Sequence, residues 1–212
     1  MEKAQNVIRY YVICNQLKNL IRTGWKNWHV NRERIESVAE HVYGAQMLAL
    51  AMYSEYEYPI DIMKVLFMLA IHEVGEARIG DLTQFEISPE EKKQKEQEAV
   101  SKILNGLLKG EEIEQLFLEF DERKTPEAFF AYQCDKLECD LQSKLYDEEG
   151  CVNLKEQEGN QTLENKKVQL LLEQGFSWSE MWLRFGQETH PYDEHFREVS
   201  NYAMNHSLKK QK

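Results

Sequence analysis

Positive charge is scarce in this chain. Its 212 residues include 26 lysines and arginines against 37 aspartates and glutamates, which gives a formal net charge of −11. A protein this acidic repels the phosphate backbone of DNA or RNA, so we do not expect a nucleic-acid polymer as a partner. A small anionic substrate stays open, because one local arginine or a metal ion can reverse the field inside a pocket.

Long apolar runs and paired cysteine motifs are also missing. The longest apolar runs, such as Val65–Ile71, are about seven residues, whereas a membrane-spanning helix needs about 20. The four cysteines, Cys14, Cys134, Cys139 and Cys151, have neither C-x-x-C nor zinc-finger spacing. The N-terminal residues carry charges and show no signal-peptide cleavage pattern. We therefore expect reduced thiols, no membrane partner and a cytoplasmic location.

Proline is rare and strand patterns are nearly absent, so the sequence predicts an all-α fold. An amphipathic helix is predicted over 3–21 and a loop over 26–36. Three helix starts have a serine followed three residues later by a glutamate, the capping-box pattern. These pairs are Ser37 with Glu40, Ser88 with Glu91, and Ser177 with Glu180.

Two further helix boundaries are predicted from single residues. Pro59 is expected to open a helix that runs to about Val74. Gly110 is expected to close the helix that begins after Ser88.

The apolar run Val65–Ile71 leads directly into His72 and Glu73. A core helix that ends in an imidazole and a carboxylate places metal-ligand groups at the edge of a packed interior. Such groups are costly to bury without a partner, so a metal ion, a cationic partner or solvent must lie nearby.

Four side chains are candidate ligands: His41, His72, Glu73 and Asp135, on three separate predicted helices. Two imidazoles and two carboxylates form a mixed nitrogen and oxygen set, which suits Mn, Co, Fe, Ni or Zn better than Ca. Four protein ligands on an octahedral ion leave two positions for water and substrate. Judged by residue type alone, His41 and His72 could instead be ordinary core or surface histidines that bind no metal.

Several motifs occur in one order along the chain. They are Gln16-Leu-Lys-Asn-Leu-Ile-Arg22-Thr-Gly-Trp25, Ser37-Val-Ala-Glu-His41, His72-Glu73-x-x-Glu76-x-x-x-x-Asp81 and Asp135-Lys-Leu-Glu138. Together they resemble the HD-domain metal-dependent phosphohydrolases, in particular the 5′-deoxynucleotidase-like branch. The resemblance spans roughly residues 10 to 146. One position departs from it, because the family's second motif is His-Asp and this chain has His72-Glu73.

The resemblance implies a role for each motif residue. His41, His72, Glu73 and Asp135 would hold one divalent metal ion (Mn, Co, Mg, Fe, Ni or Zn). Glu76 would lie near the attacking water as a proton acceptor or donor, and Asp81 near the leaving sugar oxygen. Arg22 would bind the phosphate through its guanidinium group. The extra methylene of Glu73 must shift either the metal or the helix.

Each assignment has a structural alternative. Arg22 could interact with a helix C-terminus, and Glu76 and Asp81 could pair with Arg78 on a solvated turn. Asp81 could also cap a helix. Trp25 and Trp28 could stack on a base or pack into the core, and Lys136 could support the site or lie on the surface.

The resemblance implies an HD-domain helical bundle with additional C-terminal helices. We expect one domain over 1–212, with a motif-bearing core at about 10–146 and a helical extension at about 160–206. The expected activity is release of phosphate from (deoxy)nucleoside 5′-monophosphates by a metal-activated water, in a homodimer. The alternatives are a nucleoside triphosphate hydrolase, a phosphodiesterase, or a non-catalytic protein that binds a metal or a nucleotide.

Overall fold

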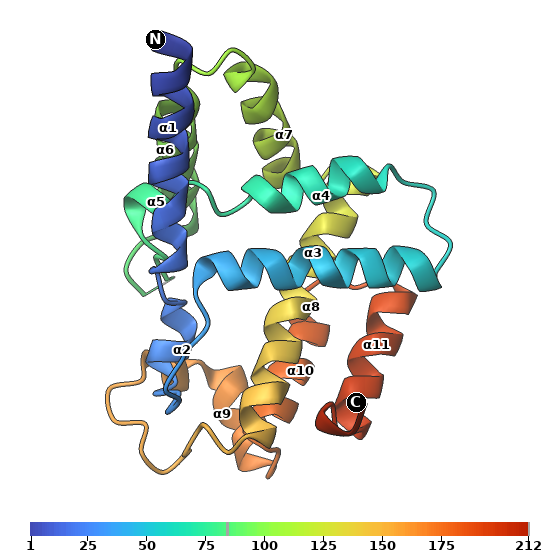
Figure 1. Cartoon of the computed structure of the whole chain (residues 1–212). Helices are drawn as coiled ribbons and strands as arrows, with labels where there is room; N and C mark the ends of the chain where they lie inside the picture. The colour runs from blue at the N-terminus through green and yellow to red at the C-terminus, as the bar shows by residue number, and fades with distance from the viewer. Residues whose placement is uncertain (84, 212) are drawn as a thin grey trace. The chain divides into compact units, whose positions relative to one another are not determined.

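The computed structural model describes residues 1–83 and 85–211, and over these residues the fold is all-α, as predicted (Figure 1). The described residues contain one isolated antiparallel bridge, between Ile21 and Ser37, and no extended strand. The elements are α1 (Glu2–Cys14), η1 (Asn15–Lys18), α2 (Thr23–Asn27), α3 (Val38–Glu55), α4 (Ile62–Ile71), α5 (Glu76–Ile79), α6 (Pro89–Leu104), α7 (Gly110–Glu122), α8 (Pro126–Glu148), η2 (Gln161–Glu164), α9 (Lys166–Glu173), α10 (Trp178–Thr189), α11 (Glu194–Asn205) and η3 (Lys209–Gln211).

The chain forms two compact units. The first contains residues 1–23 and 36–132, and the second contains residues 24–35 and 133–212. The boundary falls inside α8, so one continuous helix contributes residues to both units. The expectation of one domain over 1–212 remains a prediction.

In the first unit, α3 packs along α4, and α6 packs against α5 and α7 (Figure 1). Apolar side chains from α4, from the turn that follows it, and from α6 and α7 form a buried cluster, which we call the α4–α6–α7 core. It contains Ile71, Val74, Val100, Ile103, Leu104 and Phe117. The end of α4 is therefore fixed by packing just where the sequence places His72 and Glu73.

In the second unit, aromatic side chains dominate the core. Trp25 and Trp28 are 2% and 1% exposed, and they pack edge-on or tilted against Trp178 and Trp182. Burial of this kind rules out base stacking by Trp25 and Trp28 in this structure and confirms the core-packing alternative. Around them pack α9 and α10, in the C-terminal region where helices were expected.

All three predicted capping boxes are present, at Ser37, Ser88 and Ser177. Other boundaries differ from the predictions. The helix expected to start at Pro59 is capped by Asp61, whose carboxylate accepts the amides of Met63 and Lys64. The segment expected to form one helix over 3–21 divides into α1 and η1.

The prediction for Gly110 was wrong, because this residue begins α7 instead of ending α6. The preceding helix already ends at Leu104, and Gly106 makes the turn with a φ of +87°. A Cβ on Gly110 would lie 2.6 Å from the Leu104 carbonyl oxygen. The glycine is thus needed for a close approach of backbone to backbone and not for a helix end.

Over the residues that the structure describes, we find no helix with the length and apolar character needed to span a membrane.

Candidate metal centre

His72 stands at the C-terminal end of α4, as the sequence predicted. Val65, Met68, Leu69 and Ile71 bury the apolar face of this helix, and His72 is its C-cap residue. The His72 Nδ1 atom lies 2.7 Å from the Leu69 carbonyl oxygen. A carbonyl can only accept, so Nδ1 carries the proton, which leaves Nε2 as the ring nitrogen suited to bind a metal.

His41 and Glu73 meet the His72 ring at its Nε2 edge. His41, on α3, is fully buried, and its Nε2 atom lies 3.4 Å from His72 Nε2. The Glu73 Oε1 atom lies 3.7 Å from His72 Nε2 and 3.9 Å from His41 Nε2. Two imidazole nitrogens and one carboxylate oxygen therefore converge within the first unit.

Arg22 is brought to this cluster by a short backbone pairing. The Arg22 amide donates to the Glu36 carbonyl, and the Val38 amide donates to the Leu20 carbonyl. The guanidinium Nη1 atom then lies 3.1 Å from Glu73 Oε1, with both side chains largely buried. Arg22 thus reaches the cluster and pairs with a carboxylate there.

Glu76 begins α5 and is 2% exposed. Its Oε1 atom lies 3.4 Å from Lys92 Nζ, and its Oε2 atom is buried without a hydrogen-bond partner among the described residues. Burial, followed by the charges of Glu73 and Asp81, raises the pKa of Glu76 to about 10, although Lys92 and Arg22 oppose the shift. Burial of Glu76 argues against the solvated turn considered from the sequence.

Asp81 is held by Thr23, the first residue of α2. The Thr23 amide donates to Asp81 Oδ2 at 2.6 Å, and the Thr23 hydroxyl donates to the Asp81 carbonyl at 2.6 Å. Asp81 therefore acts as a cap, but on a helix remote in sequence rather than on a neighbouring one.

Asp135 lies on the part of α8 that belongs to the second unit. Its Oδ2 atom is 2.9 Å from Lys136 Nζ. Lys136 therefore supports the Asp135 carboxylate while its own side chain stays one-third exposed.

The donor atoms of the first unit suit a divalent cation. The His72 tautomer directs a lone pair towards His41 and Glu73, and three carboxylates, those of Glu73, Glu76 and Asp81, influence one another electrostatically. Burial and then the neighbouring carboxylates raise the pKa of Glu76, and its Oε2 atom is buried without a hydrogen-bond partner in the part of the chain that the structure describes. A cation would relieve both conditions, and mixed nitrogen and oxygen donors fit Mn, Co, Fe, Ni or Zn.

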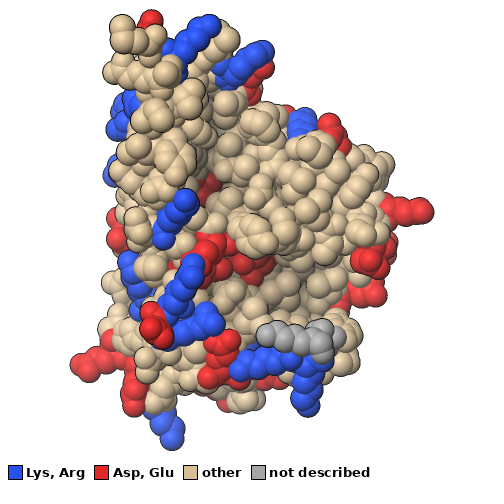
Figure 2. Space-filling model, viewed as in Figure 1, with Lys and Arg blue, Asp and Glu red and all other residues tan. Residues whose placement is uncertain are grey.

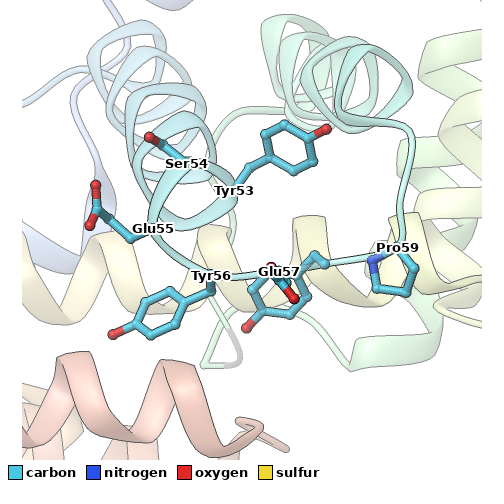
Figure 3. Close-up of a pocket in the computed structure, with 7 residues that line it drawn as sticks. Tyr53, Ser54, Glu55, Tyr56, Glu57 and Pro59 are labelled. Atoms are coloured by element: carbon cyan, nitrogen blue, oxygen red, sulfur yellow. The ribbon is translucent and has the colours of Figure 1, made fainter.

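A hollow of about 850 Å³ lies at the turn between α3 and α4 and is lined by residues 53–59. Its side chains come from one short segment, and Tyr53, Glu55 and Tyr56 point in different directions (Figure 3). It offers carboxylates from Glu55 and Glu57 but no lysine or arginine, so it does not suit a phosphate group.

The face of the molecule in Figure 2 carries lysine and arginine side chains singly or in small groups among acidic and uncharged ones. A nucleic-acid polymer needs a continuous basic stripe, and this face does not present one.

Sequence reasoning missed three residues around the cluster. Lys92 and Glu96 lie one turn apart on α6, and the Phe120 ring packs against His72 with centroids 5.2 Å apart. The i, i+4, i+8 spacing of Lys92, Glu96 and Val100 could have indicated that the first two share the face of α6 that packs into the core.

The chain matches the HD domain family over residues 14–174. Among curated proteins, it is 37% identical to 5′-deoxynucleotidase HDDC2 of Dictyostelium discoideum, over 68% of this chain and 79% of that protein. It is 33% identical to 5′-deoxynucleotidase hdd1 of Schizosaccharomyces pombe, over 68% of this chain and 74% of that protein.

Solved structures share the fold. A protein of Pyrococcus horikoshii OT3 superposes with a TM-score of 0.68 at 23% identity, covering 93% of this chain and 98% of that chain. A protein of Magnetospirillum magnetotacticum MS-1, described as a predicted metal-dependent phosphohydrolase, gives a TM-score of 0.62 at 18% identity over 99% and 94%. The resemblance seen in the motifs is therefore confirmed, and the chain belongs to the HD domain family of hydrolases.

Proposed function

We propose that the protein is a metal-dependent phosphohydrolase that releases phosphate from (deoxy)nucleoside 5′-monophosphates. The observation that carries the proposal is the convergence of His41, His72 and Glu73 with the Arg22 guanidinium 3.1 Å from Glu73. The proposed metal site and the proposed phosphate-binding group thus lie side by side. The two curated relatives described above are named 5′-deoxynucleotidases, which supports a small nucleotide as the substrate.

The proposed ligands of one divalent ion are His41, His72, Glu73 and Asp135. When bound, such an ion supplies a Lewis acid for a phosphoryl oxygen and lowers the pKa of a coordinated water. Glu73 replaces the aspartate of the family motif, and its longer arm also reaches Arg22 in this structure.

Arg22 would bind two phosphoryl oxygens through its planar guanidinium group and orient the phosphate for in-line attack. Glu76 would take the proton from the attacking water as the new P–O bond forms. As the P–O5′ bond breaks, Asp81 would give a proton to the leaving sugar oxygen, or it would hydrogen-bond to the sugar while water supplies that proton. The Thr23 amide holds the Asp81 carboxylate in place for either role.

The test is phosphate release from a panel of deoxyribo- and ribonucleoside monophosphates, with Mn, Co and Mg compared against EDTA. Metal-dependent release is the expected result, and the ratio of deoxy to ribo rates defines the sugar preference. Pyrophosphate from triphosphates would support the triphosphate hydrolase instead, and nucleotide products from diesters would support the phosphodiesterase. Binding of metal and nucleotide without turnover would support the non-catalytic alternative.

We also propose a homodimer in the cytoplasm. The dimer is an expectation from the family resemblance, and light scattering coupled to size-exclusion chromatography tests it. The cytoplasmic location is supported by the four cysteines, none of which forms a disulfide within the described part of the chain.

A further inference from the structure

We propose that Lys92 is a positioning residue, which orients the Glu76 carboxylate so that its Oε2 atom faces the reacting water, and that Glu96 holds Lys92 in place. The inference rests on the proposed function, since it assigns Lys92 a role at the same site. It is drawn from the contacts of α5 with α6, and α6 contains no residue of the sequence motifs.

A close approach of the chain brings Lys92 to Glu76. Gly75, just before Glu76, lies against α6 so closely that a Cβ on it would meet the Glu96 carbonyl oxygen at 3.2 Å and Val100 Cγ2 at 3.4 Å. The same α6 face carries Lys92 one turn before Glu96. The burial of Val100 in the α4–α6–α7 core holds α6 against Gly75, and this packing brings Lys92 close to Glu76.

The two oxygens of Glu76 are in different surroundings. Lys92 Nζ lies 3.4 Å from Oε1, whereas Oε2 is buried and has no partner among the described residues. A carboxylate held at one oxygen presents the other in a defined direction. Because the Glu76 side chain is 1% exposed, solvent does not compete for this arrangement.

Glu96 provides a second carboxylate next to the Lys92 ammonium group. Its Oε1 atom also lies 3.4 Å from Lys92 Nζ, and the Lys92 side chain is 29% exposed. A flexible lysine has many rotamers, and a second carboxylate restricts it to those that reach Glu76. The positioning role of Glu96 is thus expected to pass through Lys92, although its charge also interacts with that of Glu73.

The experiment compares K92M, K92R, E96Q and the double variant K92M/E96Q in the full chain, loaded with Mn. K93M is the matched control, because Lys93 is the next residue on α6 and pairs with Asp121 instead. We measure kcat and KM for nucleotide hydrolysis, bound Mn and the melting temperature. A crystal structure of Mn-loaded K92M then shows whether the Glu76 side chain has moved.

K92M is expected to lower kcat by about 10- to 100-fold, the scale of a small misplacement of a reacting group, with KM within about threefold and bound Mn unchanged. K92R should retain most of kcat, and K93M all of it. E96Q should lower kcat less than K92M does, and it should have no further effect in the K92M background.

A K92M variant with the wild-type kcat, or additive effects of K92M and E96Q, would overturn the proposal. If K92M has a clearly lower melting temperature than the wild type, the kinetic comparison uses K92R and E96Q instead. A wild-type kcat in E96Q would then contradict the proposed role of Glu96. If the wild type itself releases no phosphate, the proposed activity fails separately. In that case, an unmoved Glu76 in the K92M crystal structure would also refute the positioning role, whereas a displaced one would support it.

Discussion

Replacement of Gly186 by alanine is expected to destabilise the second unit strongly. Gly186 lies in α10, where a Cβ would stand 2.1 Å from Asp140 Oδ2 on α8, well short of the 3.4 Å at which ordinary contact begins. The Asp140 carboxyl group cannot simply turn away. It is 2% exposed, and the Tyr192 hydroxyl donates to its Oδ2 atom at 3.0 Å.

Two costs therefore combine in G186A. Forcing one extra methyl group into a packed interior typically costs about 1–3 kcal/mol. Losing the partner of a buried polar group costs about 1–3 kcal/mol more. We expect the free energy of unfolding to fall by about 2–6 kcal/mol, which for a chain of this size lowers Tm by roughly 4–24 °C.

The assay is thermal unfolding followed by circular dichroism and calorimetry, with G24A as the matched control. Gly24 also lies in a helix, and a Cβ there would meet nothing within 4 Å. The same substitution should therefore leave stability unchanged or raise it by about 0.4–1 kcal/mol. If G186A unfolds within 1–2 °C (roughly one-half kcal/mol) of the wild type, the close packing of α10 on Asp140 is refuted.

Three further predictions concern the proposed site and a buried carboxyl group. D135A should abolish both metal retention, measured by elemental analysis, and turnover; an unchanged rate would remove Asp135 from the ligand set. E76A should keep the metal but lower turnover by roughly 10²–10⁴-fold, as expected for loss of proton transfer, and loss of metal would contradict that role. Burial raises the pKa of Asp140 well above its usual range, although Tyr192 and Lys136 oppose the shift. The folded protein therefore keeps a proton that the unfolded chain releases above about pH 4, and the wild type loses stability as pH rises from there. D140N lacks this loss, so its Tm relative to the wild type should be higher at pH 8 than at pH 4, and a constant difference would argue against a protonated Asp140.

Local signals in the sequence predicted the parts of the fold that depend on neighbours in the chain. Each capping box joins a serine and a glutamate three residues apart, so Ser37, Ser88 and Ser177 could be identified without tertiary information. The position of His72 at the end of α4 followed in the same way from the apolar run before it.

Gly110 shows where such reasoning fails. A glycine after an apolar helix usually marks a helix end, whereas Gly110 is the first residue of a helix. The residue is a glycine because the Leu104 carbonyl leaves no room for a side chain. Only the folded chain brings that carbonyl to this position.

The candidate site likewise combines residues that the sequence motifs predicted with residues that only the folded chain reveals. The motifs identified His41, His72 and Glu73, which the fold brings together, and Arg22 beside them. Lys92 belongs to no motif, and its proximity to Glu76 arises from the packing of Gly75 against α6. The cap that Asp81 provides joins residues 58 positions apart, a pairing that no local pattern indicates.

The aromatic core of the second unit has a consequence for spectroscopy. The chain has four tryptophans, and Trp25, Trp28, Trp178 and Trp182 all belong to that unit. Indole emission selectively excited near 295 nm, a wavelength that tyrosine scarcely absorbs, would follow the second unit only, while far-ultraviolet ellipticity would follow the helices of both. Coincident transitions from the two signals would mean that the units unfold as one cooperative block. An earlier or later loss of emission would assign to each unit its own stability without any label being added.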